Sequence, residues 1–157
     1  QQVSVAAAAS MWRKFEAFAG PGVPPERVLA GSFDDLRACG LSRPKIRYVR
    51  ALAAEHIDYA ALRAAPTEEV VTTLTALPGI GRWTAEIYAK FALGHADVFA
   101  AGDLALQIAA ARAFGLPDRP SEREMRTMAD RWSPVRAVAA RALWAYYRIE
   151  TNREGVL

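Results

Sequence analysis

Glycine and proline divide this chain into short segments, and that division limits the possible folds more than any other feature. Apolar side chains recur at helical spacing from about Val3 to Phe18, and the glycines and prolines between positions 20 and 25 then end that segment. Similar short stretches follow as far as about Ile149. Alanine is abundant and runs of β-branched residues are few, which favours helix over strand. The sequence therefore predicts an all-α fold, a compact array of many short helices.

Polar residues mark the starts of several predicted helices. Ser32 with Asp35 predicts the cap of a short helix, and Ser121 with Glu124 has the spacing of a capping box. Ser42 is expected to cap another helix. Asp103 stands immediately before an apolar run, so we expect its carboxylate at an N-cap or first-turn position.

Helical spacing also predicts which side chains face the core. The spacing resumes after a glycine turn at positions 79–81, where Trp83 is the first apolar residue of the new helix. The spacing after the turn runs through Trp83, Ile87, Ala89 and Phe91. The side chains expected to be buried are Cys39, Val70, Val71, Leu74 and the two tryptophans Trp12 and Trp132.

Composition narrows the class of protein. At 157 residues with 52% hydrophobic content, the chain is long enough for one domain or for two small helical lobes. The formal charge of +3 permits a polyanionic partner without requiring one. Cys39 is the only cysteine, which excludes an intramolecular disulfide and a four-cysteine zinc or iron–sulfur site. His56 and His95 lack metal-ligand spacing. The first residues lack a basic start and a long apolar run, so we expect neither a signal peptide nor a bilayer-spanning segment in this sequence.

Pro78, Gly79, Ile80 and Gly81 form a tight turn between two predicted helices. The backbone N–H groups that begin the second helix have no intrahelical partners and lie at the positive end of the helix dipole, which makes an anion site. Because Gly79 and Gly81 have no Cβ, a phosphate can approach the main chain closely, and Arg82 adds charge. The alternative is an ordinary connection between two helices.

Three motifs in this order resemble a known family. They are Leu77–Ala85, the segment Asp97–Phe99 that leads to Asp103, and Arg131–Pro134 ahead of Trp144. The pattern resembles the helix-hairpin-helix (HhH-GPD) DNA glycosylase superfamily, and within it most resembles the 3-methyladenine DNA glycosylase II (AlkA-like) branch. The resemblance covers nearly the whole chain and implies one glycosylase domain over residues 1–157, with two helical lobes sharing a cleft. It also implies that an N-terminal part of the family fold is absent from this sequence.

The same resemblance implies roles for individual residues. Asp103 takes the place of the catalytic aspartate, and Trp83 and Trp144 take positions that supply aromatic walls of the base pocket. The residues expected to contact DNA are Gly79, Gly81, Arg82, Thr84 and Gln2. Gln2 lies near the position of the family's wedge residue, which fills the gap that a flipped base leaves in the duplex. The implied ligands of a structural monovalent cation are the main-chain carbonyls of Thr75, Leu77 and Ile80. No other cofactor and no iron–sulfur cluster is expected.

The chemistry of base excision fits these residue types. Breaking an N-glycosidic bond builds positive charge on the deoxyribose, which a nearby carboxylate such as Asp103 stabilises. An alkylated purine is cationic, and the electron-rich faces of Trp83 and Trp144 suit such a base. The alternative roles are a simple helix cap for Asp103 and core packing for the tryptophans. Bifunctional relatives carry a lysine nucleophile where this chain has Trp83, so no AP-lyase activity is expected.

We therefore predict a monofunctional DNA glycosylase of base excision repair that removes alkylated purines, such as 3-methyladenine, after they flip out of the duplex. The expected partner is double-stranded DNA with damaged bases. We expect a monomer, in the cytoplasm with the nucleoid, of bacterial origin. The alternative is a non-catalytic helix-hairpin-helix DNA-binding module, which needs Gly79 and Gly81 but not Asp103. For Asp97 the sequence leaves open a carboxylate pair with Asp103 or hydrogen bonds that hold the loop at Phe99.

Overall fold

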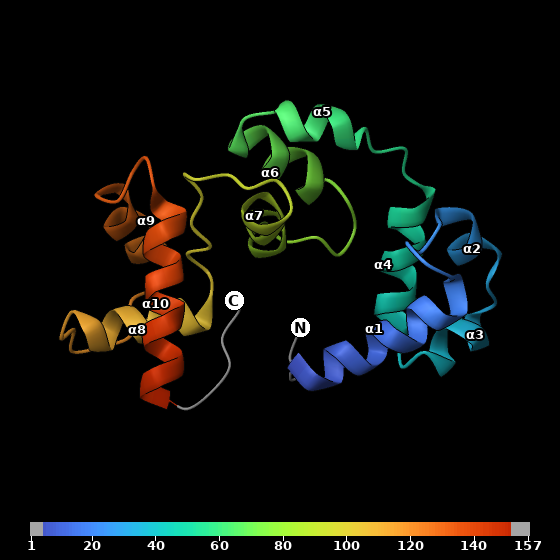
Figure 1. Cartoon of the computed structure of the whole chain (residues 1–157), viewed down its shortest axis with the longest axis horizontal. Coiled ribbons are helices and arrows are strands. Elements are labelled where there is room, and N and C mark those ends of the chain that lie inside the picture. The colour runs from blue at the N-terminus through green and yellow to red at the C-terminus, as the bar shows by residue number, and fades with distance from the viewer. Residues whose placement is uncertain (1–4, 152–157) are drawn as a thin grey trace. The chain divides into compact units, whose positions relative to one another are not determined.

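The computed structural model describes residues 5–151, and this part of the chain consists of α-helices joined by turns and loops, without a β-strand (Figure 1). The prediction of an all-α fold is confirmed. The helices are α1 (Val5–Ala19), α2 (Pro25–Ala30), α3 (Phe33–Ala38), α4 (Arg43–Ala54), α5 (Tyr59–Ala64), α6 (Thr67–Thr75), α7 (Arg82–Phe91), α8 (Leu104–Ala113), α9 (Glu122–Asp130) and α10 (Arg136–Thr151). Within the described residues, none of these helices combines the length and apolar character needed to cross a bilayer.

The described chain forms two compact units. Unit 1 runs to Asp58 and includes Leu77–Gly79, so it contains α1 to α4 and the first part of the glycine turn. Unit 2 contains Tyr59–Ala76 and the residues from Ile80 onward, and therefore α5 to α10.

Two capping boxes begin helices as the sequence predicts. Ser32 Oγ accepts from the backbone N–H of Asp35 at 3.1 Å, and the Asp35 carboxylate accepts from the N–H of Ser32 at 2.9 Å. Ser121 and Glu124 repeat this arrangement at the start of α9. Ser42 is the N-cap residue of α4, but its side chain does not make the expected hydrogen bond. Backbone conformation therefore sets the start of α4 without a side-chain acceptor.

The sequence prediction missed α2. We expected the prolines after α1 only to end a helix, whereas Pro25 also begins one. Proline has no N–H to satisfy at the first helical position, and its fixed φ suits the helix. The same residue type that ends α1 therefore starts α2.

The core of unit 1 lies between α1 and the short helices that follow. Its buried residues include Phe15, Leu36, Cys39 and Ile46, and α4 packs against α2 and α3. The burial predicted for Cys39 is confirmed, but the burial predicted for Trp12 is wrong, because its side chain is 53% exposed. Residues 6–9 of α1 are exposed as well, so none of the described residues of unit 1 covers this end of the helix.

The core of unit 2 is built by α8, α9 and α10. Leu106, Met125 and Trp144 are among its fully buried side chains, α8 packs against α10, and Trp132 packs on the same core while remaining partly exposed. In α6 the burial predicted for Val70, Val71 and Leu74 is confirmed.

The buried face of α7 coincides only in part with the apolar spacing predicted from the sequence, because Ala89 is buried as that spacing suggests. Ala85, Glu86 and Ala89 are buried, whereas Phe91 is exposed. The two alanines let α6 pack closely on this face, and Glu86 is buried there because arginines neutralise it, as described below. A hydrophobic pattern does not identify a buried charge of this kind.

Candidate active site

Asp103 lies at the end of a buried loop of unit 2. Val98, Phe99, Ala100 and Ala101 are all buried, and the amide of Gln107 donates to the Ala101 carbonyl at 3.0 Å. The backbone N–H of Asp103 donates to the Ala100 carbonyl at 2.9 Å. These contacts leave little freedom for the loop, and the Asp103 side chain is only 6% exposed.

Three N–H groups from three helices donate to the Asp103 carboxylate. Leu106 N, in α8, donates to Oδ1 at 3.0 Å, which confirms the predicted N-cap. Trp144 Nε1, in α10, donates to the same oxygen at 3.1 Å, and Trp83 Nε1, in α7, donates to Oδ2 at 2.9 Å. Each carboxylate oxygen offers about two lone-pair sites, so Oδ1 is fully used and Oδ2 keeps one.

The donors to Asp103 are all electrically neutral. They orient the carboxylate and compensate for its lost hydration, but they form no ion pair that would cancel its negative charge. The arrangement is therefore able to present a fixed anion to a developing positive charge, or to accept a proton from a water molecule at Oδ2. The cap role and a chemical role for Asp103 are compatible, because different lone pairs serve them.

The two tryptophans expected to form walls of a base pocket have unequal surroundings. Trp83 is 37% exposed, so part of its ring is open. Trp144 is 2% exposed, with the Phe91 ring 5.9 Å away and Lys90 Nζ 5.4 Å from its ring centroid. Trp144 therefore orients Asp103 from within the core, and its role as a wall of the base pocket stays a prediction.

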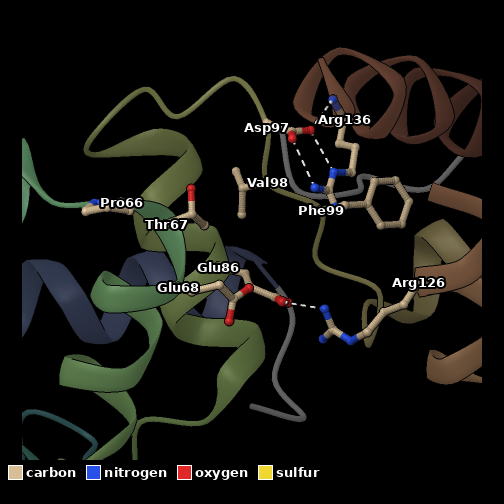
Figure 2. A pocket seen from close by; sticks show the side chains of 9 residues that line it. All are labelled: Pro66, Thr67, Glu68, Glu86, Asp97, Val98, Phe99, Arg126 and Arg136. Carbon is tan, nitrogen blue, oxygen red and sulfur yellow. Dashed lines mark hydrogen bonds and ion pairs between the residues drawn. The ribbon is translucent and has the colours of Figure 1, made fainter. Parts of the chain in front are cut away.

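An ion-pair network around one buried carboxylate, that of Glu86, holds the first turns of α7, which carry Trp83. Glu86 is 3% exposed, and its Oε1 accepts from Arg82 Nε at 2.9 Å and from Arg126 Nη1 at 2.7 Å. Arg82 also donates to Glu68 of α6 at 2.8 Å, and Figure 2 shows the Glu86–Arg126 pair at one side of a pocket. Arg82, predicted to contact DNA, thus has its guanidinium engaged by two carboxylates.

A second ion pair at the same pocket fixes the loop that leads to Asp103 (Figure 2). The Asp97 carboxylate accepts from Arg136 Nε at 2.6 Å, from Arg136 Nη2 at 3.0 Å and from Ser133 Oγ at 2.9 Å. The hydrogen bonds from the Arg136 side chain, with a smaller contribution from Ser133, lower the pKa of Asp97 to about 2. Of the two roles left open for Asp97, the structure supports the one in which it holds the loop.

Gly79 and Gly81, the two glycines of the hairpin at positions 78–81, serve different purposes. Gly79 has φ +85°, and a Cβ added to it would lie 2.2 Å from Cγ of Tyr48, which shares unit 1. Gly81 is extended, begins α7 without a side-chain cap, and has no atom within 4 Å of an added Cβ position. Open approach to the main chain, predicted for both glycines, is thus a property of Gly81, whereas Gly79 makes room for an aromatic ring.

The remaining predicted site residues have simpler placements. Thr84 lies in the first turn of α7, and the Thr75 hydroxyl donates to the Val71 carbonyl at 2.7 Å within α6. Gln2 lies outside the described residues. The cation site at the carbonyls of Thr75, Leu77 and Ile80 stays a prediction. Among residues 5–151, no cluster of three or more His, Cys, Asp or Glu side chains is arranged to hold a metal ion.

A family model described as HhH-GPD superfamily base excision DNA repair protein matches residues 1–134, most of the chain. The chain belongs to the HhH-GPD superfamily. DNA-3-methyladenine glycosylase 1 of Schizosaccharomyces pombe is 30% identical over 151 residues, which are 92% of this chain and 66% of that protein. DNA-3-methyladenine glycosylase 2 of Escherichia coli K12 is 31% identical over 127 residues, which are 76% of this chain and 41% of that protein. The chain thus spans less than two thirds of either curated relative.

A solved structure supports the same assignment. The 3-methyladenine DNA glycosylase Mag1 of Schizosaccharomyces pombe, in complex with abasic DNA, has a TM-score of 0.82 and 29% sequence identity. The match covers 96% of this chain and 75% of that one. The resemblance inferred from the three motifs, including the 3-methyladenine glycosylase branch, is confirmed.

Sequence reasoning missed three residues that position this HhH-GPD site. Glu86 and Gln107 were overlooked because polar residues are not expected on a buried helix face, and Tyr48 because it is distant in sequence from the hairpin. One signal was available for Glu86: it stands four residues after Arg82, the spacing of an ion pair on one helix face.

The hairpin glycines yield the first prediction. Gly79→Ala is expected to lower the free energy of unfolding by about 1–3 kcal/mol, because the side chain meets Tyr48 in a strained backbone conformation. Gly81→Ala is the matched control and should change it by less than about 1 kcal/mol, since its backbone and surroundings accept a Cβ. Urea denaturation measures both. Equal effects of the two substitutions would contradict the assigned roles.

The Asp97–Arg136 pair yields a pH-dependent prediction. Because the folded-state pKa of Asp97 is about 2, below its ordinary 3.8, the pair stabilises the fold fully above about pH 4 and loses this effect as the pH falls to about 2. Asp97→Asn should cost about 1 kcal/mol near neutral pH, a modest value because both side chains are partly exposed. Urea unfolding of the wild type, of Asp97→Asn and of the control Asp118→Asn, from about pH 2 to neutral pH, measures the free energy of unfolding. A variant that matches the wild type near neutral pH would contradict the prediction.

Proposed function

We propose that this HhH-GPD protein is a DNA glycosylase that hydrolyses the N-glycosidic bond of alkylated purines in duplex DNA. The observation that carries the proposal is the Asp103 carboxylate, oriented by the indole N–H groups of Trp83 and Trp144 and left with one unused lone pair on Oδ2. A helix cap alone requires only the bond from Leu106 N. Two further donors from α7 and α10 indicate that the direction of this carboxylate matters.

The proposed reaction needs only a fixed anion and water. As the C1′–N bond breaks, its electron pair leaves with the base and positive charge develops on the deoxyribose. Asp103 stabilises that charge, and Oδ2 accepts a hydrogen bond from the water whose oxygen bonds to C1′, so the water proton leaves through Asp103 or solvent. The products are the free base and an abasic site.

Alkylated purines are the proposed substrates for two reasons. An N-alkylated purine such as 3-methyladenine carries positive charge and leaves readily, so it requires little help from a general acid. The open part of the Trp83 ring can stack on such a cation, an interaction worth about 1 kcal/mol. The relatives named above, 3-methyladenine glycosylases, agree with this choice.

Trp83 also argues against cleavage of the DNA strand. A lyase forms a Schiff base through a lysine amine, and Trp83 occupies the place where bifunctional relatives carry that lysine. An indole that donates to Asp103 cannot act as such a nucleophile. The proposed activity is therefore monofunctional.

We propose that the DNA backbone binds at the start of α7. The N–H groups of its first turn have no side-chain cap, and Gly81 leaves the main chain open to a phosphate. A monovalent cation at the hairpin carbonyls and a wedge at Gln2 belong to the same proposal. A non-catalytic DNA-binding module would need this helix start but would make no use of the contact between Trp83 and Asp103.

Asp103→Asn tests the proposal. Under single-turnover conditions with excess protein and methylated duplex DNA, the variant should release 3-methyladenine at least about 100-fold more slowly than the wild type, because the fixed anion is lost. Asp118→Asn, an exposed aspartate outside the site, is the matched control and should match the wild type.

DNA binding by the same two variants separates the alternatives. Asp103→Asn is expected to keep affinity for duplex DNA within about threefold, since backbone contacts dominate binding. If wild type and Asp103→Asn both bind DNA but release no base, the non-catalytic module is the correct function. Equal release by the two would contradict the role of Asp103.

A further inference from the structure

A hollow of about 310 Å³ lies at the far end of α7 from the hairpin, within unit 2. Its lining includes Lys90 and Phe91 of α7, His95 of the following turn, and Ala137, Val138 and Arg141 of α10. Lys90 follows the first residue of α7 by eight positions, which places it about 12 Å along the helix axis from the hairpin end. The hollow is thus separate from the proposed phosphate contacts.

The charged side chains that line this hollow are both positive. Lys90 and Arg141 both line it, and none of the described residues in its lining is acidic. Lys90 Nζ donates to the Ala137 carbonyl and lies 5.5 Å from the Phe91 ring centroid and 5.4 Å from that of Trp144, but it binds no carboxylate among the described residues. Burial, together with the neighbouring Arg141 charge, lowers the pKa of Lys90. Two cations therefore share a partly enclosed space without a counter-charge.

Arg141 has no partner of its own within the described part of the chain. The neighbouring arginines Arg126 and Arg136 each bind carboxylates, whereas Arg141 makes no ion pair there. A guanidinium presents its donors in a planar fork that matches a carboxylate or phosphate. An anion placed between Arg141 and Lys90 would relieve the repulsion between them.

The walls of the hollow select among anions. Phe91 and Val138 expose much of their side chains into or beside it, and Ala137 contributes further apolar surface. Inorganic phosphate has no apolar surface to pack on these walls, so they add nothing to its binding free energy. An anion with a hydrocarbon body covers the walls, and their removal from water favours its binding. The hollow therefore offers a ligand two cationic groups beside an apolar wall.

We propose that this hollow is a binding site for organic carboxylates that carry a compact apolar body, with Lys90 and Arg141 holding the carboxylate and Phe91 and Val138 covering the body. The proposal does not depend on the glycosylase activity. It differs in charge from the base site, where a cationic purine is proposed beside Asp103.

NMR titration with cyclohexanecarboxylate tests this site. We expect shifts confined to the amides around Lys90 and Arg141, with a Kd of about 1 mM for a ligand of this size. Cyclohexylmethanol, which lacks the charge, and inorganic phosphate, which lacks the apolar body, should each bind at least about tenfold more weakly. Equal binding of phosphate and cyclohexanecarboxylate would overturn the proposal, because the walls would then have no role.

Two variants and one competitor complete the test. Arg141→Gln, at an exposed position that should not affect folding, and Lys90→Met should each weaken cyclohexanecarboxylate binding at least about tenfold, whereas Arg148→Gln, on the same helix but outside the hollow, should not. Unchanged binding by Arg141→Gln would overturn the proposal even if Lys90→Met failed to fold. Displacement of the carboxylate by undamaged duplex DNA would also overturn it and assign the hollow to DNA.

Discussion

The Asp103 carboxylate is a charge at the edge of an apolar core, and the architecture of unit 2 depends on how that charge is satisfied. An unsatisfied carboxylate in this position would cost several kcal/mol. Three N–H donors prevent that cost, and they come from α7, α8 and α10. The three helices must therefore keep their relative positions, since a displacement of about 1 Å would break a hydrogen bond.

Other polar contacts hold those helices in place. Glu86 and its arginines connect α7 to α6 and α9, while Asp97 and Arg136 connect the loop before α8 to the start of α10. Both arrangements consist of carboxylates bound by arginine, which gives directional hydrogen bonds where apolar packing alone would allow sliding. Arg82 thereby contributes to the site through Glu86, and its contact with DNA stays a prediction.

Local chemistry made much of this fold predictable from sequence. Both capping boxes, the buried face of α6 and the N-cap at Asp103 depend on residues a few positions apart, and all were predicted correctly. The contacts that were missed depend on partners far along the chain. Neither the burial of Trp144 behind Phe91 nor the Tyr48 ring over Gly79 leaves a periodic signal. Trp12 was misjudged because a tryptophan at helical spacing does not reveal whether another element covers it.

The central claim is that Trp83 and Trp144 orient Asp103 for chemistry. Trp83→Phe keeps an aromatic face but removes the N–H that donates to Oδ2, so it isolates this hydrogen bond. Loss of a hydrogen bond to a charged group predicts single-turnover release of 3-methyladenine slowed by about 10- to 100-fold, together with a loss of about 1–3 kcal/mol in the free energy of unfolding that still leaves the protein folded. Release at the wild-type rate by a folded Trp83→Phe protein would contradict the claim.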